Sequence, residues 1–151
     1  VVRPDGEAQA YEFRSEGVEC RMIRDGNEVL VRSTVKGKPR EASVKLGGKQ
    51  WFGSFDQTLR YMSAYGKPEV CVYLINPTNP GKAIEFRFEA VGNDTVSGIN
   101  AKKVKVCLTG ALSALWSAYY WVDGSGEILK YQGSEGPGTK ERLIEFVSAG
   151  D

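Results

Sequence analysis

Short runs of alternating apolar and polar residues, separated by turn residues, fill most of this chain and constrain its fold more than any other feature. The clearest run is residues 83–91, AIEFRFEAV, in which Ile84, Phe86 and Phe88 alternate with charged residues. A period of two is typical of a strand that has one face in a core and the other in water. About ten such runs follow one another, so the sequence predicts a mostly antiparallel β protein.

Residues 9–52 repeat one simple unit, an alternating run followed by a turn. Residues 25–27, DGN, supply the positive-φ positions of a tight hairpin, and the glycines at 37 and 47–48 close later units. This repetition predicts an antiparallel meander with one dry face and one wet face.

A change of period predicts the one helix of the chain, over residues 55–65. Ser54 and Gln57 match the Ser-x-x-Gln capping box that begins helices, while Gly66 followed by Pro68 supplies a stop. The apolar residues of this segment are spaced by four and three: Phe55, Leu59 and Met62. We expect the helix to pack on the sheet, and the alternative is an amphipathic helix that binds a partner.

Several later strands are predicted with less regular boundaries. Residues 69–76, EVCVYLIN, are apolar on both faces, which predicts a strand covered on both sides. Residues 92–94, GND, are predicted to turn the preceding strand into a short one at residues 95–97. A wide loop is expected at residues 133–138, before a last strand at 142–148.

Residues 116–132, WSAYYWVDGSGEILKYQ, predict a hairpin whose register decides which side chains share a face. If residues 124–126 form a three-residue loop with Gly126 in the left-handed conformation, Asp123 faces Glu127. This loop predicts an apolar face with the pairs Trp121–Leu129 and Tyr119–Tyr131, and a mixed face with Tyr120–Lys130 and Val122–Ile128. A two-residue turn would instead pair Trp121 with Ile128.

Histidine is absent, and this absence is the strongest functional statement that the composition makes. Histidine is the commonest general base, the commonest metal ligand and the usual activator of a serine or cysteine nucleophile. The glycine-rich residues 133–138 lack the lysine and the following helix of a phosphate-binding loop. We therefore predict that the protein is not an enzyme and has no catalytic residues, no cofactor and no metal site.

The charges are nearly balanced, with 20 basic and 19 acidic side chains and a formal net charge of +1. A nucleic-acid binder normally gathers a basic excess on one face, so we predict no nucleic-acid partner. The longest apolar run falls short of the roughly 18 residues of a membrane span, so we predict no transmembrane segment. The first residues, VVRPD, do not form a signal peptide, and we expect that a leader has been removed.

The length and the cysteines favour one core without a disulfide framework. A chain of 151 residues fits a single domain, 1–151, and buries roughly two thirds of its extended surface without staples. Cys20, Cys71 and Cys107 make an odd count with wide spacing, so we expect buried small apolar side chains. The alternative is one disulfide and one free thiol.

Three motifs lie in the second half: Gly98 followed by Ala-Lys-Lys-Val at 101–104, Tyr-Trp and an acidic-glycine turn at 120–124, and Lys-Tyr-x-Gly at 130–133 followed by Gly-Pro-Gly at 136–138. Over residues 84–146 the chain resembles a group of uncharacterised Gram-negative bacterial proteins, described only as a domain of unknown function. The resemblance implies a periplasmic protein of the cell envelope. The implied fold is similar to the lipoprotein carriers of the LolA and LppX type, which is a single strongly curved antiparallel sheet, or half-barrel, of about ten strands with one central helix on its concave side.

Aromatic residues concentrate where this fold would have its concavity. Ordinary core packing explains most of them, and the competing interpretation is an unfilled apolar concavity that takes a lipid or similar ligand. If the likeness extends that far, the helix closes the cavity as a lid or plug. The expected cavity lining is Trp51, Phe55, Leu59, Met62, Phe86, Phe88, Tyr119, Trp121, Leu129 and Tyr131.

The leading hypothesis is thus a non-enzymatic periplasmic protein that binds a hydrophobic ligand, a lipid or acyl chain, in the concave face of a curved sheet. The alternative is a structural or protein-interaction module of the bacterial envelope, with a self-filled core and no ligand, that meets another envelope protein. An enzyme ranks third, because the sequence names no acid, base or nucleophile.

Overall fold

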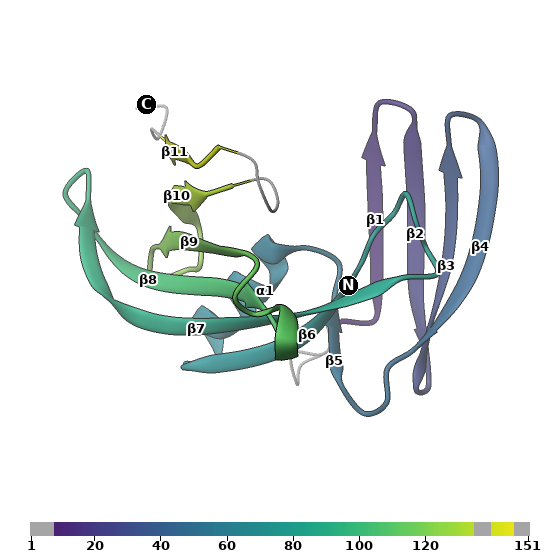
Figure 1. Cartoon of the computed structure of the whole chain (residues 1–151), viewed down its shortest axis with the longest axis horizontal. Coiled ribbons are helices and arrows are strands. Elements are labelled where there is room, and N and C mark those ends of the chain that lie inside the picture. The colour runs from purple at the N-terminus through teal and green to yellow at the C-terminus, as the bar shows by residue number, and fades with distance from the viewer. Residues whose placement is uncertain (1–7, 135–139, 147–151) are drawn as a thin grey trace. The chain divides into compact units, whose positions relative to one another are not determined.

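The computed structural model describes residues 8–134 and 140–146, and this part of the chain is mostly β with one α-helix (Figure 1). Its strands are β1 (Ala10–Ser15), β2 (Val18–Asp25), β3 (Glu28–Val35), β4 (Lys38–Lys45), β5 (Gln50–Phe52), β6 (Glu69–Ile75), β7 (Ala83–Val96), β8 (Ile99–Leu108), β9 (Ser117–Val122), β10 (Ile128–Gly133) and β11 (Arg142–Glu145). Its helices are α1 (Phe55–Ala64) and the 3-10 helix η1 (Gly110–Leu112). Neither helix has the length and apolar character needed to cross a membrane. Most of the predicted loop at 133–138, and the predicted end of the last strand at 147–148, lie outside the described residues.

The prediction of one continuous sheet is wrong, because the strands form two sheets. The first has four strands in the order β1-β2-β3-β4, and the second has seven in the order β11-β10-β9-β8-β7-β6-β5. Both orders have two ends, so neither sheet closes on itself.

The division follows from β5, which does not pair with β4. Gly47 and Gly48, which follow β4 after Leu46, both adopt positive φ and redirect the chain there. The three residues of β5 then pair in parallel with β6, with Trp51 opposite Tyr73. Parallel neighbours need a crossover connection, and α1 supplies it in the sequence between β5 and β6. The parallel pair of β5 and β6, with α1 between them, therefore interrupts the antiparallel series that the alternation of apolar and polar residues alone predicts.

Contacts within the chain define two compact units, which are described separately below. The first unit comprises Val1–Gln57 and Cys71–Glu85, and the second comprises Thr58–Val70 and Phe86–Asp151.

In the first unit, the predicted meander over β1–β4 is confirmed. Neighbouring strands pair antiparallel along their whole length, and Gly26 turns β2 into β3 with a φ of 58°. On one face Met22, Val29 and Val31 are buried, with exposed fractions of at most 1%. The other face carries mostly charged, exposed side chains, so the predicted dry and wet faces are present.

The predicted helix and both of its end signals are confirmed. The hydroxyl of Ser54 accepts a hydrogen bond from the amide of Gln57 at 3.2 Å, and the side chain of Gln57 accepts one from the amide of Gly53 at 2.9 Å. At the other end Gly66 has a φ of 59°, and the amide of Lys67 donates to the carbonyl of Met62 at 2.9 Å.

In the second unit, β7 to β11 form an antiparallel series. Phe88 lies opposite Val106, which lies opposite Ala118, and all three side chains are fully buried. The predicted turn at residues 92–94 is wrong, because β7 continues to Val96. A β-bulge between Ala90 and Gly92 accommodates the glycine within the strand, so the strand does not end there.

None of the three cysteines forms a disulfide. Cys20 and Cys107 are buried as predicted, but Cys71 is exposed. The reason is that β6 alternates between buried and exposed residues at its start, so the prediction that this strand is covered on both sides is wrong.

We predict that Gly53→Ala destabilises the protein by about 1–3 kcal/mol, because a new Cβ would overlap a packed ring. That Cβ would lie 2.1–2.6 Å from ring atoms of Tyr11, which sits directly on the glycine backbone. Urea unfolding monitored by circular dichroism measures the change. The matched control is Gly81→Ala, where a Cβ would meet nothing within 4 Å. Equal stability of the two variants would contradict the contact.

Candidate binding surfaces

The residues predicted to line one cavity do not share one face. Trp51 and Phe55 belong to the first unit and the other eight to the second. Within the second unit, Phe88 shares a face with Val106 and Ala118, because paired residues of an antiparallel ladder point the same way. Trp121 lies three residues after Ala118 along β9 and therefore points to the opposite face.

The remaining predicted residues divide along the same lines. Phe86 lies two residues from Phe88 on β7 and shares its face, whereas Tyr119 shares the face of Trp121. Tyr131 pairs with Tyr120 and so lies on the opposite face from Tyr119. Leu129 instead clusters with Trp121, against which Tyr119 also packs.

The predicted hairpin loop is confirmed, but the register behind it is not. The amide of Asp123 donates to the carbonyl of Glu127 at 3.0 Å, Gly126 has a φ of 86°, and Val122 lies opposite Ile128. A β-bulge between Ile128 and Lys130 then inserts Leu129 as an extra residue. The observed pairs are therefore Trp121–Lys130, Tyr120–Tyr131 and Tyr119–Gln132 in place of Trp121–Leu129 and Tyr119–Tyr131.

Most of the predicted lining is closely packed. A side chain that borders a void large enough for a ligand keeps accessible surface, even when the void is internal. Six of the ten residues expose 7% or less: Trp51, Leu59, Met62, Phe88, Trp121 and Leu129. Their surfaces are therefore filled by neighbouring protein atoms rather than by a ligand-sized space.

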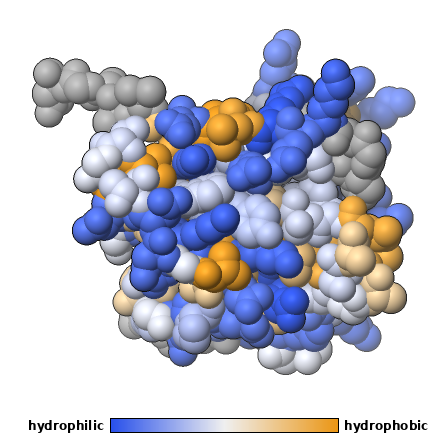
Figure 2. All heavy atoms as spheres, turned by 60° about the vertical axis from the view of Figure 1, so that its left-hand side comes forward, coloured by the Kyte–Doolittle hydropathy of each residue, from blue (hydrophilic) through white to orange (hydrophobic). Residues whose placement is uncertain are grey.

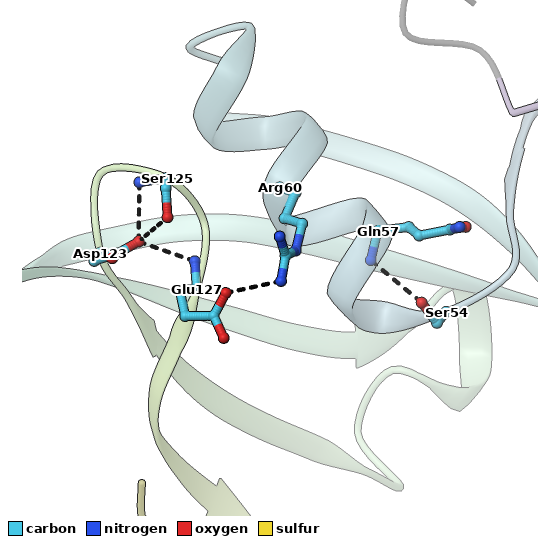
Figure 3. Close-up of polar contacts among 6 residues, drawn as sticks. All are labelled: Ser54, Gln57, Arg60, Asp123, Ser125 and Glu127. Carbon is cyan, nitrogen blue, oxygen red and sulfur yellow. Dashed lines mark hydrogen bonds and ion pairs between the residues drawn. The ribbon is translucent and has the colours of Figure 1, made fainter. Parts of the chain in front are cut away.

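The hairpin loop packs directly on α1, as Figure 3 shows for its polar contacts. A Cβ at Gly126 would lie 2.6 Å from the Cα of Arg60 and 3.0 Å from the carbonyl oxygen of Leu59. The guanidinium of Arg60 also donates to the carboxylate of Glu127 at 2.7 Å. Gly126 thus meets two requirements at once, a left-handed backbone and contact with a helix backbone.

One carboxylate oxygen of Asp123 organises this loop (Figure 3). It accepts hydrogen bonds from the amide and the hydroxyl of Ser125 at 2.9 and 2.7 Å, and from the amide of Glu127 at 2.9 Å. The Ser125 hydroxyl and then the backbone amides hold the pKa of Asp123 below its usual value. The sequence signal for this arrangement is the spacing of aspartate and serine in DGSG.

Trp121 lies at the centre of a row of three residues on neighbouring strands. Lys103 on one side and Lys130 on the other each place Nζ 4.8 Å from its ring centroid. The indole Nε1 donates to a carboxylate oxygen of Asp94 at 2.9 Å. Hydrogen bonds from the Thr95 amide and then from this indole lower the pKa of Asp94. Two lysine ammonium groups and one hydrogen bond therefore hold an aromatic ring that sequence analysis assigned to a ligand cavity.

The wet side of β1–β4, which we call the outer face, carries a feature that sequence analysis missed. Its side chains form rows across the four strands, and the two that matter are Glu12–Arg21–Arg32–Glu41 and Ala10–Ile23–Leu30–Ser43. Two hollows of about 380 and 400 Å³ open on this sheet, and both are lined by Arg21, Arg32 and Glu41. Strand pairing brings these residues together from four separate runs, so the sequence signal appears only once the hairpin registers are assigned.

Exposed apolar side chains elsewhere are dispersed. In the second unit the most exposed are Leu143, Leu115, Leu112 and Phe146, at 53–61%. Figure 2 shows one face of the molecule, on which hydrophobic patches lie apart from one another between hydrophilic side chains. Scattered exposure of this kind is normal for a protein surface.

The titratable side chains of the described residues take part in structural contacts. No group of three or more acidic or cysteine side chains among these residues is arranged to hold a metal ion. Burial, with a smaller contribution from Tyr131, raises the pKa of Tyr120, so its hydroxyl stays protonated at neutral pH. Burial also raises the pKa of the Cys20 thiol, which disfavours the reactive thiolate.

No protein-family model matches this chain, and no curated protein matches it. Among solved structures it is similar to the crystal structure of a β-barrel-like protein of the domain of unknown function DUF1849 from Brucella abortus. The sequences are 11% identical, the match covers 85% of this chain and 58% of that one, and the TM-score is 0.61. At this identity the likeness concerns the fold alone, and this chain spans 58% of the length of its neighbour. A β-barrel-like fold of unknown function is the part of the predicted resemblance that this supports.

We predict that Gly126→Ala destabilises the protein by about 2–4 kcal/mol, from left-handed backbone strain and overlap with α1. Chemical unfolding at neutral pH measures the effect. Gly124→Ala in the same loop is the matched control, because a Cβ there would meet nothing within 4 Å and the backbone is not left-handed. A Gly126→Ala protein as stable as the Gly124→Ala protein would show that the loop does not pack closely on the helix.

We predict that Asp123→Asn costs about 1 kcal/mol at pH 7, since the loop carboxylate is partly exposed and its hydrogen bonds are partly screened. Because the folded-state pKa of Asp123 is lowered, its stabilisation is present above the unfolded pKa of about 3.9 and is lost as pH falls through the folded pKa. Urea unfolding at pH 7, 4 and 2.5 should show the two proteins converging. A constant difference would assign the effect to packing instead.

Proposed function

We propose that this chain is a non-enzymatic protein-interaction module of the bacterial envelope, with a core filled by its own side chains. The observation that carries the proposal is the close packing of the predicted cavity lining, in which Trp51, Leu59 and Phe88 expose at most 1% of their surface. A small-molecule site normally keeps a preformed concave space of several hundred Å³, and these residues border none.

The periplasm is the location that we propose, on the motifs at Gly98, residues 101–104 and residues 120–124. They resemble an exported Gram-negative group, and the β-barrel-like neighbour of unknown function is compatible with the same fold. Two observations support a non-catalytic role. The sequence lacks histidine, and the carboxylates of Asp94 and Asp123 accept hydrogen bonds from Trp121 and Ser125 that hold the structure together.

Binding of a lipid or acyl chain, as in carriers of the LolA and LppX type, is the second candidate. One observation favours it: the indole Nε1 of Trp51 is buried and has no hydrogen-bond partner among the described residues. A buried unpaired donor costs about 1–3 kcal/mol, and the carbonyl or carboxylate of a ligand would remove that cost. The ligand would then be bound by residues around Trp51 rather than by all ten residues of the predicted cavity lining.

Native mass spectrometry separates the two candidates. The protein is purified without detergent from the cell that produces it, and a solvent-extracted sample serves as the control. We expect both samples to show the bare 16.6 kDa chain or complexes with other proteins. An adduct of several hundred daltons that is present in the untreated sample and absent after solvent extraction would overturn the self-filled core and favour the lipid carrier.

A further inference from the structure

We propose that the outer face of β1–β4 is the docking surface for a partner protein, and that it takes a segment with a carboxylate side chain next to apolar side chains. This inference rests on the proposed function and names the surface and the chemistry that it would use. The carboxylate would bind between Arg21 and Arg32, and the apolar side chains would cover Ile23 and Leu30.

The two arginines lie directly opposite each other on the central strands β2 and β3. Like charges directly opposite each other on a sheet are unfavourable unless an anion compensates them. Each arginine contacts one glutamate of an outer strand through Nε, Arg21 with Glu12 at 3.4 Å and Arg32 with Glu41 at 3.2 Å. Each of these contacts is a single atom pair through Nε, whereas a guanidinium fork matches a carboxylate best when two of its N–H groups donate in parallel.

The glutamate contacts are weak enough to leave the arginines adaptable. The four side chains involved are 59–78% exposed. Exposed pairs of this kind contribute little, because water and salt screen them. A partner carboxylate that is partly shielded from water on docking would interact more strongly with the arginines than these glutamates do.

An apolar row lies next to the charged row. Ile23 and Leu30 face each other across β2 and β3, and they are 39% and 44% exposed. They line the hollow of about 400 Å³ that also contains Arg21 and Arg32. Arginine is enriched at protein interfaces, and the buried centre of an interface is more apolar than its rim, so an arginine pair beside exposed apolar surface fits a docking site.

Charge and shape favour a protein segment over other occupants. The charged row is neutral as a whole, with the two arginines at its centre and a glutamate at each end, so it matches one carboxylate placed at the centre rather than the continuous negative charge of an anionic membrane. The hollows lie open on a sheet surface, which would leave most of a small lipid in water. A second copy stacked about a two-fold axis through the row would place arginine over arginine and glutamate over glutamate.

The experiment is an NMR titration of the whole ¹⁵N-labelled chain with two synthetic peptides, acetyl-LELEL-amide and acetyl-LQLQL-amide. We expect the acidic peptide to shift the Nε–Hε signals of Arg21 and Arg32 and the amide signals of Ile23 and Leu30. It should bind about tenfold more tightly than the glutamine peptide, since two exposed charge-assisted contacts of about 0.7 kcal/mol each are involved. Raised salt should reduce this preference.

Matched variants on the same face test the assignment. Arg21→Gln combined with Arg32→Gln should abolish the preference for the acidic peptide, while Lys45→Gln, on the same face but outside both hollows, should keep it. Because these side chains are exposed, all the variants should fold, as circular dichroism would verify. Equal binding of the two peptides, shifts confined to other surfaces, or no shift at all would overturn the proposal.

A parallel titration with myristate distinguishes the failure of this inference from the failure of the proposed function. Saturable shifts of the Trp51 indole signal with myristate would overturn the interaction module in favour of the lipid carrier. Absence of such shifts together with equal binding of the two peptides would leave the module intact and remove only the outer face as its docking surface.

Discussion

Parallel pairing of the three-residue strand β5 with β6 is the constraint on which the rest of the fold depends. A parallel pair cannot be closed by a tight turn, so a crossover must lie between the two strands, and α1 is that crossover. The pairing takes the chain away from the edge of β4 and begins a second sheet. Without it, continued antiparallel pairing would give the single sheet that the strand pattern favours. The outer face of β1–β4 exists as a separate surface because the series ends at β4.

Local signals in the sequence predicted the elements well. The alternation at residues 83–91, the capping residues Ser54 and Gln57, and the loop at residues 124–126 all encode structure within a few neighbours along the chain. Such information is contained in backbone preference and short-range hydrogen bonding. Helix ends and hairpin turns were therefore predictable from one sequence.

Longer-range features of the candidate surfaces were not predictable in the same way. A single extra residue at Leu129 changes which side chains of β10 face those of β9, and nothing in ILKYQ marks the insertion. The row that contains Arg21 and Arg32 needs three hairpin registers to be correct at once. Trp121 was assigned to a cavity because the predicted register placed it on an apolar face, yet two lysine side chains and Asp94 cover it. Residue type predicts burial, but it does not say what provides the cover.

The bulges at Val91 and Leu129 have a consequence for how this chain is compared with others. Each one reverses the parity of its strand, so that residues two apart across the bulge no longer point the same way. A period-two pattern that is counted through either bulge therefore mixes residues of the two faces. A distant homologue that lacks one of these residues would keep the same core with a frame offset by one. Its relationship would emerge when strand halves are aligned separately, with a gap allowed inside the strand rather than only in the turns.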